Sequence, residues 1–153
     1  MMFLIFIGSM LVLNSCKKPA TVFVQNNVTP VDYEYGLNAT MYNANLMLYN
    51  GNDFIGEIAL GDITPGGGES QTVELDDNVE KVKVKWNYYP SNQTLFDNPI
   101  RYTAQFYLIN ANEENEITLT DETLVSNSPD KKGEGKVGDI VKMEKSKMDK
   151  INR

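Results

Sequence analysis

The side chains that could do acid-base, nucleophilic or metal chemistry are few in this 153-residue chain, because it has no histidine and a single cysteine. Histidine is the commonest general base, the commonest metal ligand and the usual partner of a catalytic serine or cysteine. One cysteine cannot form an internal disulfide or a zinc site built from several thiolates. Any enzyme chemistry would have to come from carboxylates, lysines or tyrosines.

Two groups of carboxylates come closest to a site. The three glutamates within residues 113–116 offer the hard oxygen atoms that calcium prefers, but they lack the Asp-x-Asp-x-Asp-Gly order of an EF-hand loop. A glycoside hydrolase needs two carboxylates held across a cleft, and no spacing here indicates one. The residues considered for such a pair are Glu57, Asp62, Asp76 and Asp77. We interpret both groups as solvated loop residues and expect no catalytic residue, metal or cofactor.

Aromatic residues offer binding rather than catalysis. The segment from Trp86 to Phe96 is the richest aromatic cluster of the chain. Strand alternation predicts that Trp86 and Tyr88 point inward. Tyr89 and Phe96 would then lie near a loop, where they could stack on a sugar or contact a protein partner. We take these two residues as possible ligand or partner contacts.

A hairpin is predicted over residues 71–86, with Asp77-Asn78 as its two-residue turn. This register places Val73 opposite Val82 and Glu74 opposite Lys81. It also puts apolar residues on one face of the second strand and lysines on the other. The apolar face holds Val82, Val84 and Trp86, and the lysine face holds Lys81, Lys83 and Lys85. We interpret the lysine face as solvated, with a charged surface that discourages edge-to-edge aggregation.

Residues 21–126 alternate with the two-residue period of strands rather than the 3.6-residue period of helices. Besides the hairpin, predicted strands cover 21–25, 46–49, 54–63, 101–109 and 116–120, and Leu124-Val125 extends the sheet. Asn50-Gly51, between two of these strands, is a strong signal for a tight turn. We predict an all-β fold, namely a six- or seven-stranded antiparallel sandwich of the immunoglobulin-like or transthyretin-like kind.

The last two long strands carry their own face assignments. In the strand over 101–109, one side holds Tyr102, Ala104, Phe106 and Leu108. In the strand over 116–120, Ile117 and Leu119 alternate in the same way. The polar residues 110–115 are expected to join the two strands as a hairpin loop.

The first sixteen residues resemble a targeting signal. Residues 1–13 form an apolar run that is too short to span a bilayer but has the length of a signal-peptide core. It ends in Leu13-Asn14-Ser15-Cys16, which resembles the lipobox of bacterial lipoproteins, with Asn14 as a departure from the pattern. In that family the signal is cut before the cysteine, whose thiol carries a diacylglycerol. The resemblance implies cleavage guided by Leu13, Ser15 and Cys16, and lipidation at Cys16.

The same resemblance implies a location in the cell envelope. Lys17 stands where an aspartate would hold such a lipoprotein in the inner membrane, which favours the outer membrane. The Asn- and Tyr-rich chain is similar to lipoproteins of the Bacteroidetes, in which an acidic cluster after the cysteine directs export to the cell surface. Lys17-Lys18-Pro19 lacks that cluster. We expect a periplasm-facing lipoprotein of the outer membrane, bound to the membrane through its N-terminal lipid.

The domain organisation follows from these boundaries. We predict a signal peptide at 1–15, a lipid-anchored linker at 16–20, a β-sandwich domain at 21–126 and a charged tail at 127–153. The four linker residues after Cys16 span at most about 14 Å, which keeps the domain close to the bilayer. The start of the tail has the composition of a flexible linker, and Asp139 could cap a short helix beyond it. We predict that the tail is disordered or forms a short helix, and that a partner is the reason if it orders.

Charge and composition narrow the function. Residues 16–126 hold six Lys or Arg against sixteen Asp or Glu, within a net charge of −7, so a nucleic-acid partner is not expected. We predict a lipid-anchored binding or scaffolding protein of the cell envelope, without catalysis and with a protein partner. Its size and layout resemble those of the accessory lipoprotein of the type VI secretion machine. The alternative is a carbohydrate-binding lipoprotein, in which Tyr89 and Phe96 would form the platform.

Overall fold

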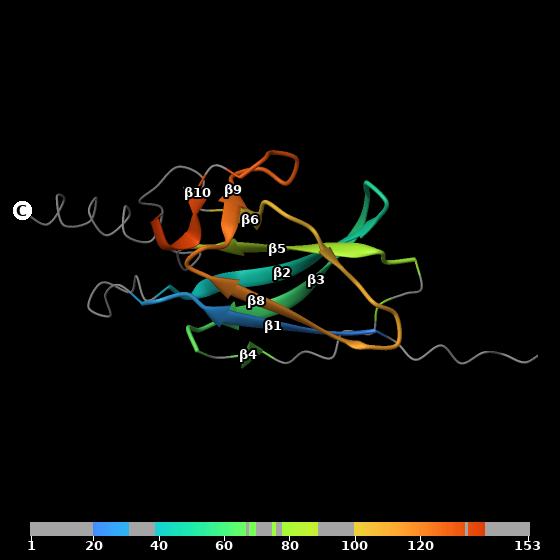
Figure 1. The fold of residues 1–153 in the computed structure, drawn as a ribbon, viewed down its shortest axis with the longest axis horizontal. Coiled ribbons are helices and arrows are strands. Elements are labelled where there is room, and N and C mark those ends of the chain that lie inside the picture. The colour runs from blue at the N-terminus through green and yellow to red at the C-terminus, as the bar shows by residue number, and fades with distance from the viewer. Residues whose placement is uncertain are drawn as a thin grey trace, which may run out of the picture.

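The computed structural model describes residues 20–30, 39–66, 68–69, 75, 78–88, 100–133 and 135–139, and it is an all-β sandwich (Figure 1). This confirms the fold class predicted from the alternating pattern. The strands are β1 (Thr21–Asn27), β2 (Met41–Asn50), β3 (Asp53–Ile63), β4 (Gly68–Glu69), β5 (Lys81–Asn87), β6 (Ile100–Thr103), β7 (Tyr107–Leu108), β8 (Glu114–Thr120), β9 (Leu124–Ser126) and β10 (Gly135–Lys136).

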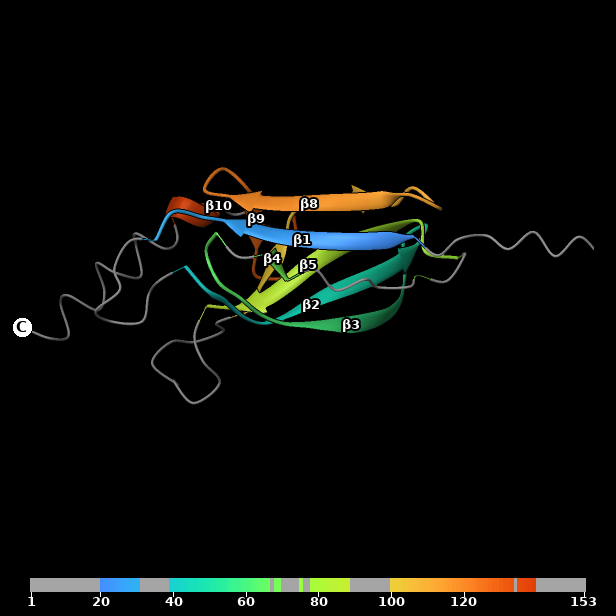
Figure 2. The ribbon, with the colours of Figure 1, turned by 90° about the horizontal axis from the view of Figure 1, so that it is seen from below.

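Two sheets form the layers of the sandwich. The large sheet has the order β10-β9-β6-β5-β2-β3, with β7 also paired to β5. Figure 2 shows β1 and β8 side by side above it, and these two strands form the small sheet together with β4. β1 and β8 run parallel, in register from Thr21 opposite Glu114 to Asn27 opposite Thr120. This parallel pair is a departure from the antiparallel arrangement predicted for the sandwich.

The core lies between the sheets and is built from the inward residues of β1, β5 and β8. Each of these strands buries every second residue, as the alternation in the sequence predicts. The buried apolar residues of the three strands are Val22, Val24, Val82, Val84, Trp86, Ile117 and Leu119. Burying an aliphatic or aromatic side chain of this size stabilises the fold by about 1.5–3 kcal/mol.

The β2–β3 hairpin confirms the turn expected at Asn50-Gly51. Asn50 pairs with Asp53, so Gly51 and Asn52 form the two-residue connection. Gly51 has a φ of 56°, in the left-handed region that residues other than glycine, asparagine and aspartate rarely adopt. The turn chemistry of a short segment was therefore enough to place this hairpin.

The hairpin predicted over residues 71–86 is wrong in its pairing. A strand in a sheet has only two edges, and both edges of β5 are occupied by other strands. Lys81 lies opposite Tyr49 on one side and Leu108 on the other, and Val82 lies between Leu48 and Tyr107. Neither can pair with residues 73 or 74. Leu75 instead forms an isolated antiparallel bridge with Ala20.

The strand predicted over residues 101–109 is two shorter strands, and its partner is not the one expected. β6 ends at Thr103 and β7 begins at Tyr107. The loop that follows does not close a hairpin, because β8 pairs with β1 in the small sheet. Asn115 of β8 stabilises the passage of the chain from the large sheet to the small sheet. Its side-chain amide donates to the carbonyl oxygens of Thr21, Asn110 and Glu113 at 3.1 Å each.

The sandwich continues beyond the predicted boundary at residue 126. β10 pairs with β9 through Gly135 opposite Val125 and Lys136 opposite Leu124. Val137 is buried in the core, and its backbone N–H donates to the Thr123 carbonyl at 3.0 Å. Residues 127–133 and 135–139 therefore belong to the domain rather than to a separate tail. A helical turn begins at residues 137–139, and residues 140–153 lie outside the described residues.

Candidate functional site

The site residues singled out in the sequence lie outside the part of the chain that the structure describes. These are Leu13, Ser15 and Cys16 of the lipobox, and Tyr89 and Phe96 of the aromatic cluster. Their roles stay predictions. Among the described residues, no helix has both the length and the apolar character needed to cross a membrane.

The carboxylates that could have formed a site have structural roles where they are described. Asp62 accepts a hydrogen bond from the backbone N–H of Asn43 at 2.7 Å. Glu57 forms an ion pair with Lys85. Over the described ranges, three or more His, Cys, Asp or Glu side chains nowhere gather closely enough to hold a metal ion. The described carboxylates therefore give no support to hydrolysis or calcium binding.

The candidate site lies on the outer face of the large sheet, the face turned away from β1 and β8. Cross-strand pairs place four residues in one row across β7, β5, β2 and β3. The row consists of Leu108, Lys81, Tyr49 and Phe54. In a sheet, residues directly opposite each other point to the same face. Three of the four are apolar or aromatic, which is unusual for a face that carries a run of lysines.

Tyr49 of this row is the centre of an aromatic cluster that also includes Phe106, from the segment between β6 and β7. Phe54 lies edge-on to Tyr49 with 5.7 Å between ring centroids, and Phe106 does so at 5.0 Å. Tyr49 is 5% exposed, whereas Phe54 is 51%, Phe106 38% and Leu108 76% exposed. We call Tyr49, Phe54, Phe106 and Leu108 the outer patch. Isolated exposed apolar residues are ordinary, but a contiguous group of this kind is typical of an interaction surface.

Two ammonium groups converge on the outer patch. The Nζ of Lys81 lies 4.1 Å from the ring centroid of Phe106, and that of Lys83 lies 4.5 Å from it. Lys81 also donates to the side-chain oxygen of Asn52 at 3.1 Å. Cation–π contacts and a neutral amide oxygen stabilise these charges without neutralising them.

Lys83 is buried, in contrast to the prediction of a solvated lysine face. Its side chain is 3% exposed, beneath the loop that follows β9, and its Nζ donates to the Pro129 carbonyl at 2.6 Å. Desolvation lowers the pKa of Lys83, Asp130 partly offsets this by raising it, and Lys81 lowers it further. The charge is therefore held away from water next to the outer patch.

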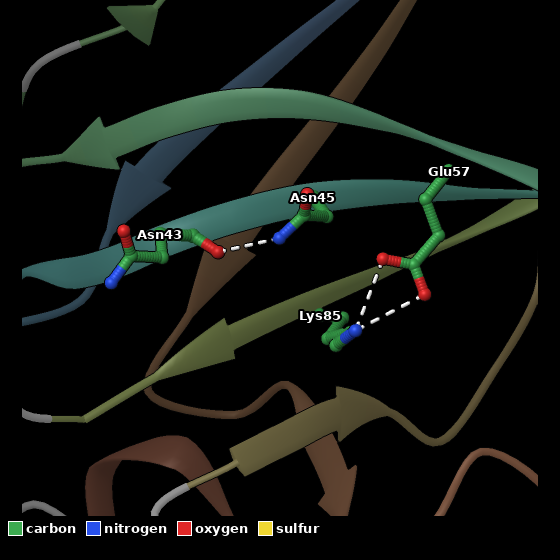
Figure 3. Close-up of polar contacts among 4 residues, drawn as sticks. All are labelled: Asn43, Asn45, Glu57 and Lys85. Atoms are coloured by element: carbon green, nitrogen blue, oxygen red, sulfur yellow. Dashed lines mark hydrogen bonds and ion pairs between the residues drawn. The ribbon is translucent and has the colours of Figure 1, made fainter. Parts of the chain in front are cut away.

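Lys85, two residues further along β5, has a different environment. Its Nζ contacts both carboxylate oxygens of Glu57, at 3.0 and 3.1 Å, across the intervening strand β2 (Figure 3). Nearby, the Asn45 amide donates to the Asn43 carbonyl at 2.7 Å. This end of the outer face is polar, and of the three lysines of β5 only Lys85 has an ion pair with a described residue.

The outer patch presents side chains that are suited to binding. Burial raises the pKa of Tyr49, with Asp130, Tyr102 and Glu57 acting in the same direction, so its phenol stays protonated at neutral pH. The described side chains around it include no nucleophile hydrogen-bonded to a base. What the patch offers is apolar area next to positive charge.

Comparisons with known proteins add no relative. No family model, curated protein or solved structure matches the chain.

Part of this site was predictable from the sequence. Tyr102, Phe106 and Leu108 were predicted to share one side of a strand, and Tyr102 and Leu108 do lie on the same face, opposite Lys85 and Lys81. What the alternation could not show is that this side faces outward. A lysine row on the neighbouring strand marks that face, but it could be recognised only after the pairing of β5 with β7 was known.

Proposed function

We propose that the chain is a lipid-anchored protein of the bacterial cell envelope that binds a protein partner and acts as a scaffold, without catalysis. The anchor rests on the resemblance of Leu13-Asn14-Ser15-Cys16 to a lipobox. The binding function rests on one observation, the exposed outer patch centred on the buried Tyr49. An accessory role in an envelope-spanning secretion machine is one setting for such a scaffold.

The physical case for a protein partner is the composition of the outer patch. Protein interfaces are enriched in aromatic residues at their centre, and a few such anchors carry most of the binding energy. Phe54 and Phe106 each pack edge-on against Tyr49, a contact that restricts the orientation of their rings. Anchors that are positioned before binding lose less conformational entropy, so more of their contact energy appears as affinity.

A carbohydrate ligand is less well supported by this surface. Sugars stack on open aromatic ring faces, whereas the Nζ atoms of Lys81 and Lys83 lie over the ring of Phe106. The platform predicted for a glycan, Tyr89 and Phe96, lies outside the described residues. We therefore favour the scaffold over the carbohydrate-binding lipoprotein.

Site-specific photo-crosslinking in intact cells tests the binding function. A photoreactive phenylalanine analogue replaces Leu108 or Phe54 in the outer patch, or Glu116 on the exposed face of β8 as the matched control. We expect discrete protein adducts from positions 108 and 54 and none from position 116. Adducts that are equal at all three positions, or absent from the two patch positions, would contradict a scaffold that uses this surface.

The anchor is tested separately. Cys16→Ala is expected to move the protein from the membrane fraction to the soluble fraction and to abolish labelling by a palmitate analogue. Cys16 is the only cysteine, so no second thiol can take up the label. Labelling that persists in this variant would refute lipidation at Cys16, whatever the crosslinking shows.

A further inference from the structure

Two lysines of the outer patch have no ion-pair partner among the described residues, although the carboxylate of Asp130 raises the pKa of one of them, Lys83. Lys85 pairs with Glu57, and Lys136 pairs with Glu122. Lys81 and Lys83 form no ion pair with any residue that the structure describes, although they lie within 4.5 Å of the same ring centroid. Two adjacent ammonium groups repel each other, and the repulsion is stronger where water is excluded.

This shortage of counter-charges is local, because the chain is rich in carboxylates. Residues 16–126 hold sixteen Asp or Glu against six Lys or Arg. Of the described acidic residues around the patch, Glu57 is paired with Lys85, and Glu80 accepts a hydrogen bond from the backbone N–H of Gly51 at 2.9 Å. Asp130 raises the pKa of Lys83 but forms no ion pair with it. Lys81 has no ion-pair partner among the described residues despite this excess of acidic groups, so an anion from outside can fill this position.

Building on the proposed function, we infer that the partner segment docked on the outer patch carries a carboxylate next to apolar side chains, with Lys81 as the residue that contacts the carboxylate. Lys81 is half-buried and its Nζ lies at the patch surface, over Phe106. Lys83 lies deeper and adds positive potential that water cannot screen, because its side chain is buried. Phe54, Phe106 and Leu108 provide the apolar contacts on either side of Lys81.

The charges make this partner chemistry specific. A basic segment would be repelled by both ammonium groups, and a neutral apolar segment would leave Lys81 covered and unpaired, which costs free energy. An acidic and apolar segment removes both penalties, because a carboxylate bonded to an ammonium group makes one of the stronger hydrogen bonds available. The arrangement therefore discriminates between partners by charge as well as by shape.

Selection from a random peptide library on the full chain tests the inference. We expect the selected peptides to be enriched in Asp or Glu directly beside Leu, Ile or Phe. Binding of a selected peptide should fall about tenfold in Lys81→Gln, the loss expected for one charge-assisted hydrogen bond. Lys85→Gln is the matched control, since Lys85 is already paired with Glu57, and it should leave binding unchanged. Circular dichroism and urea unfolding confirm that each variant is folded.

The outcomes separate this inference from the proposed function. Peptides that depend on Phe54 and Leu108 but show no acidic enrichment, or that bind Lys81→Gln as well as the native chain, would overturn the inference and leave the scaffold function standing. Selected peptides whose binding is unaffected by Leu108→Ser and Phe54→Ser would contradict both. Self-association of the protein that Lys81→Gln abolishes, detected by light scattering, would assign the surface to a second copy and overturn the inference of a separate partner.

Discussion

The two faces of β5 belong to one seven-residue strand and are stabilised in different ways. On the inner face Val82, Val84 and Trp86 are all buried against the small sheet, and the environment is uniformly apolar. On the outer face each lysine has a different surrounding: Lys81 lies over Phe106, Lys83 is buried beneath Pro129, and Lys85 pairs with Glu57. The alternation of the strand determines which residues share a face, but it does not determine what covers that face.

The two faces of β5 differ in what packs against them. The inner face is covered by whole strands, whereas the middle of the outer face is covered by Phe106 and by the loop at Pro129, which is 46 positions from Lys83 in the sequence. A cover made of single residues and a loop leaves part of the surface exposed. The candidate site is therefore on the outer face, where apolar side chains remain exposed.

The largest expected effect is on the inner face. Trp86→Ala removes a buried indole that packs edge-on against Tyr88, with 6.2 Å between centroids, and leaves a cavity in the core. We expect the free energy of unfolding to fall by about 3–5 kcal/mol, measured by urea denaturation. Leu108→Ala on the exposed outer patch is the control, with an expected change below about 0.5 kcal/mol. Equal losses in the two variants would show that the faces do not differ in the way described.

The next largest effect is expected in residues 135–139, which follow the loop at Pro129 and place Val137 in the core. In Gly138→Ala the new Cβ would lie 2.8 Å from the Cβ of Asp121, so the chain at β10 and Val137 must shift. We expect a loss of about 1–3 kcal/mol in the free energy of unfolding. Gly56→Ala is the matched control, because the space around its Cβ is open to 4 Å, and it should change stability by less than about 1 kcal/mol. If Gly138→Ala unfolds with the native midpoint, residues 135–139 do not stabilise the sandwich.

Replacing Lys83 is expected to change the free energy of unfolding by a smaller amount that depends on pH. Lys83→Met keeps most of the apolar stem and removes a buried charge together with its hydrogen bond to Pro129, so stability at neutral pH should change by no more than about 1 kcal/mol. In the native chain the folded pKa lies below the ordinary value of 10.5. At pH values between the lowered pKa of the folded state and 10.5, the unfolded state binds more protons at Lys83 than the folded state does. The contribution of Lys83 to the free energy of unfolding therefore rises with pH in this window.

Urea unfolding of both proteins across this alkaline window isolates that contribution. The free energy of unfolding of the native chain should increase relative to that of Lys83→Met as the pH approaches 10.5. The raised pKa of Tyr49 acts in both proteins and cancels from the comparison. A difference that stays constant or decreases with pH would mean that Lys83 is not desolvated in the folded state.

The smallest effect is expected for the ion pair at the polar end of the outer face. Lys85 and Glu57 are both partly exposed, so solvent weakens their attraction. A double-mutant cycle with Lys85→Gln and Glu57→Gln should give a coupling free energy of about 0.2–1 kcal/mol that decreases when salt is added. A coupling as large as the loss in Gly138→Ala would place this pair among the main determinants of stability and remove the contrast with the inner face.

Local signals in the sequence predicted the features that depend on neighbouring residues. The turn at Gly51 and the inward positions of Val84 and Ile117 follow from a positive φ and a two-residue period. The pairing of β5 did not follow, because the turn signal at Asp77-Asn78 is local, whereas β5 pairs with strands that approach from elsewhere in the chain.

The candidate site shows the same division between local and long-range information. Leu108 could be assigned to a side of its strand, but its 76% exposure depends on which face of the sheet the second layer covers. The continuation of the domain to Val137 was missed because one apolar residue in a charged segment gives no periodic signal. The burial of Lys83 was missed because it is caused by a distant loop rather than by neighbouring residues in the sequence.

The parallel pairing of β1 and β8 has a consequence for the order in which the protein folds. The amide of Asn115 reaches a carbonyl oxygen 94 positions earlier, at Thr21, so the small sheet closes a loop that contains most of the domain. Closing so long a loop costs conformational entropy. The β2–β3 hairpin of the large sheet joins strands that are adjacent in the sequence, so its formation has a smaller entropic cost. β1 must therefore wait, unpaired with β8, until residues 114–120 have been synthesised. We therefore expect the pairing of β1 with β8 to be completed after the β2–β3 hairpin, which closes a far shorter loop.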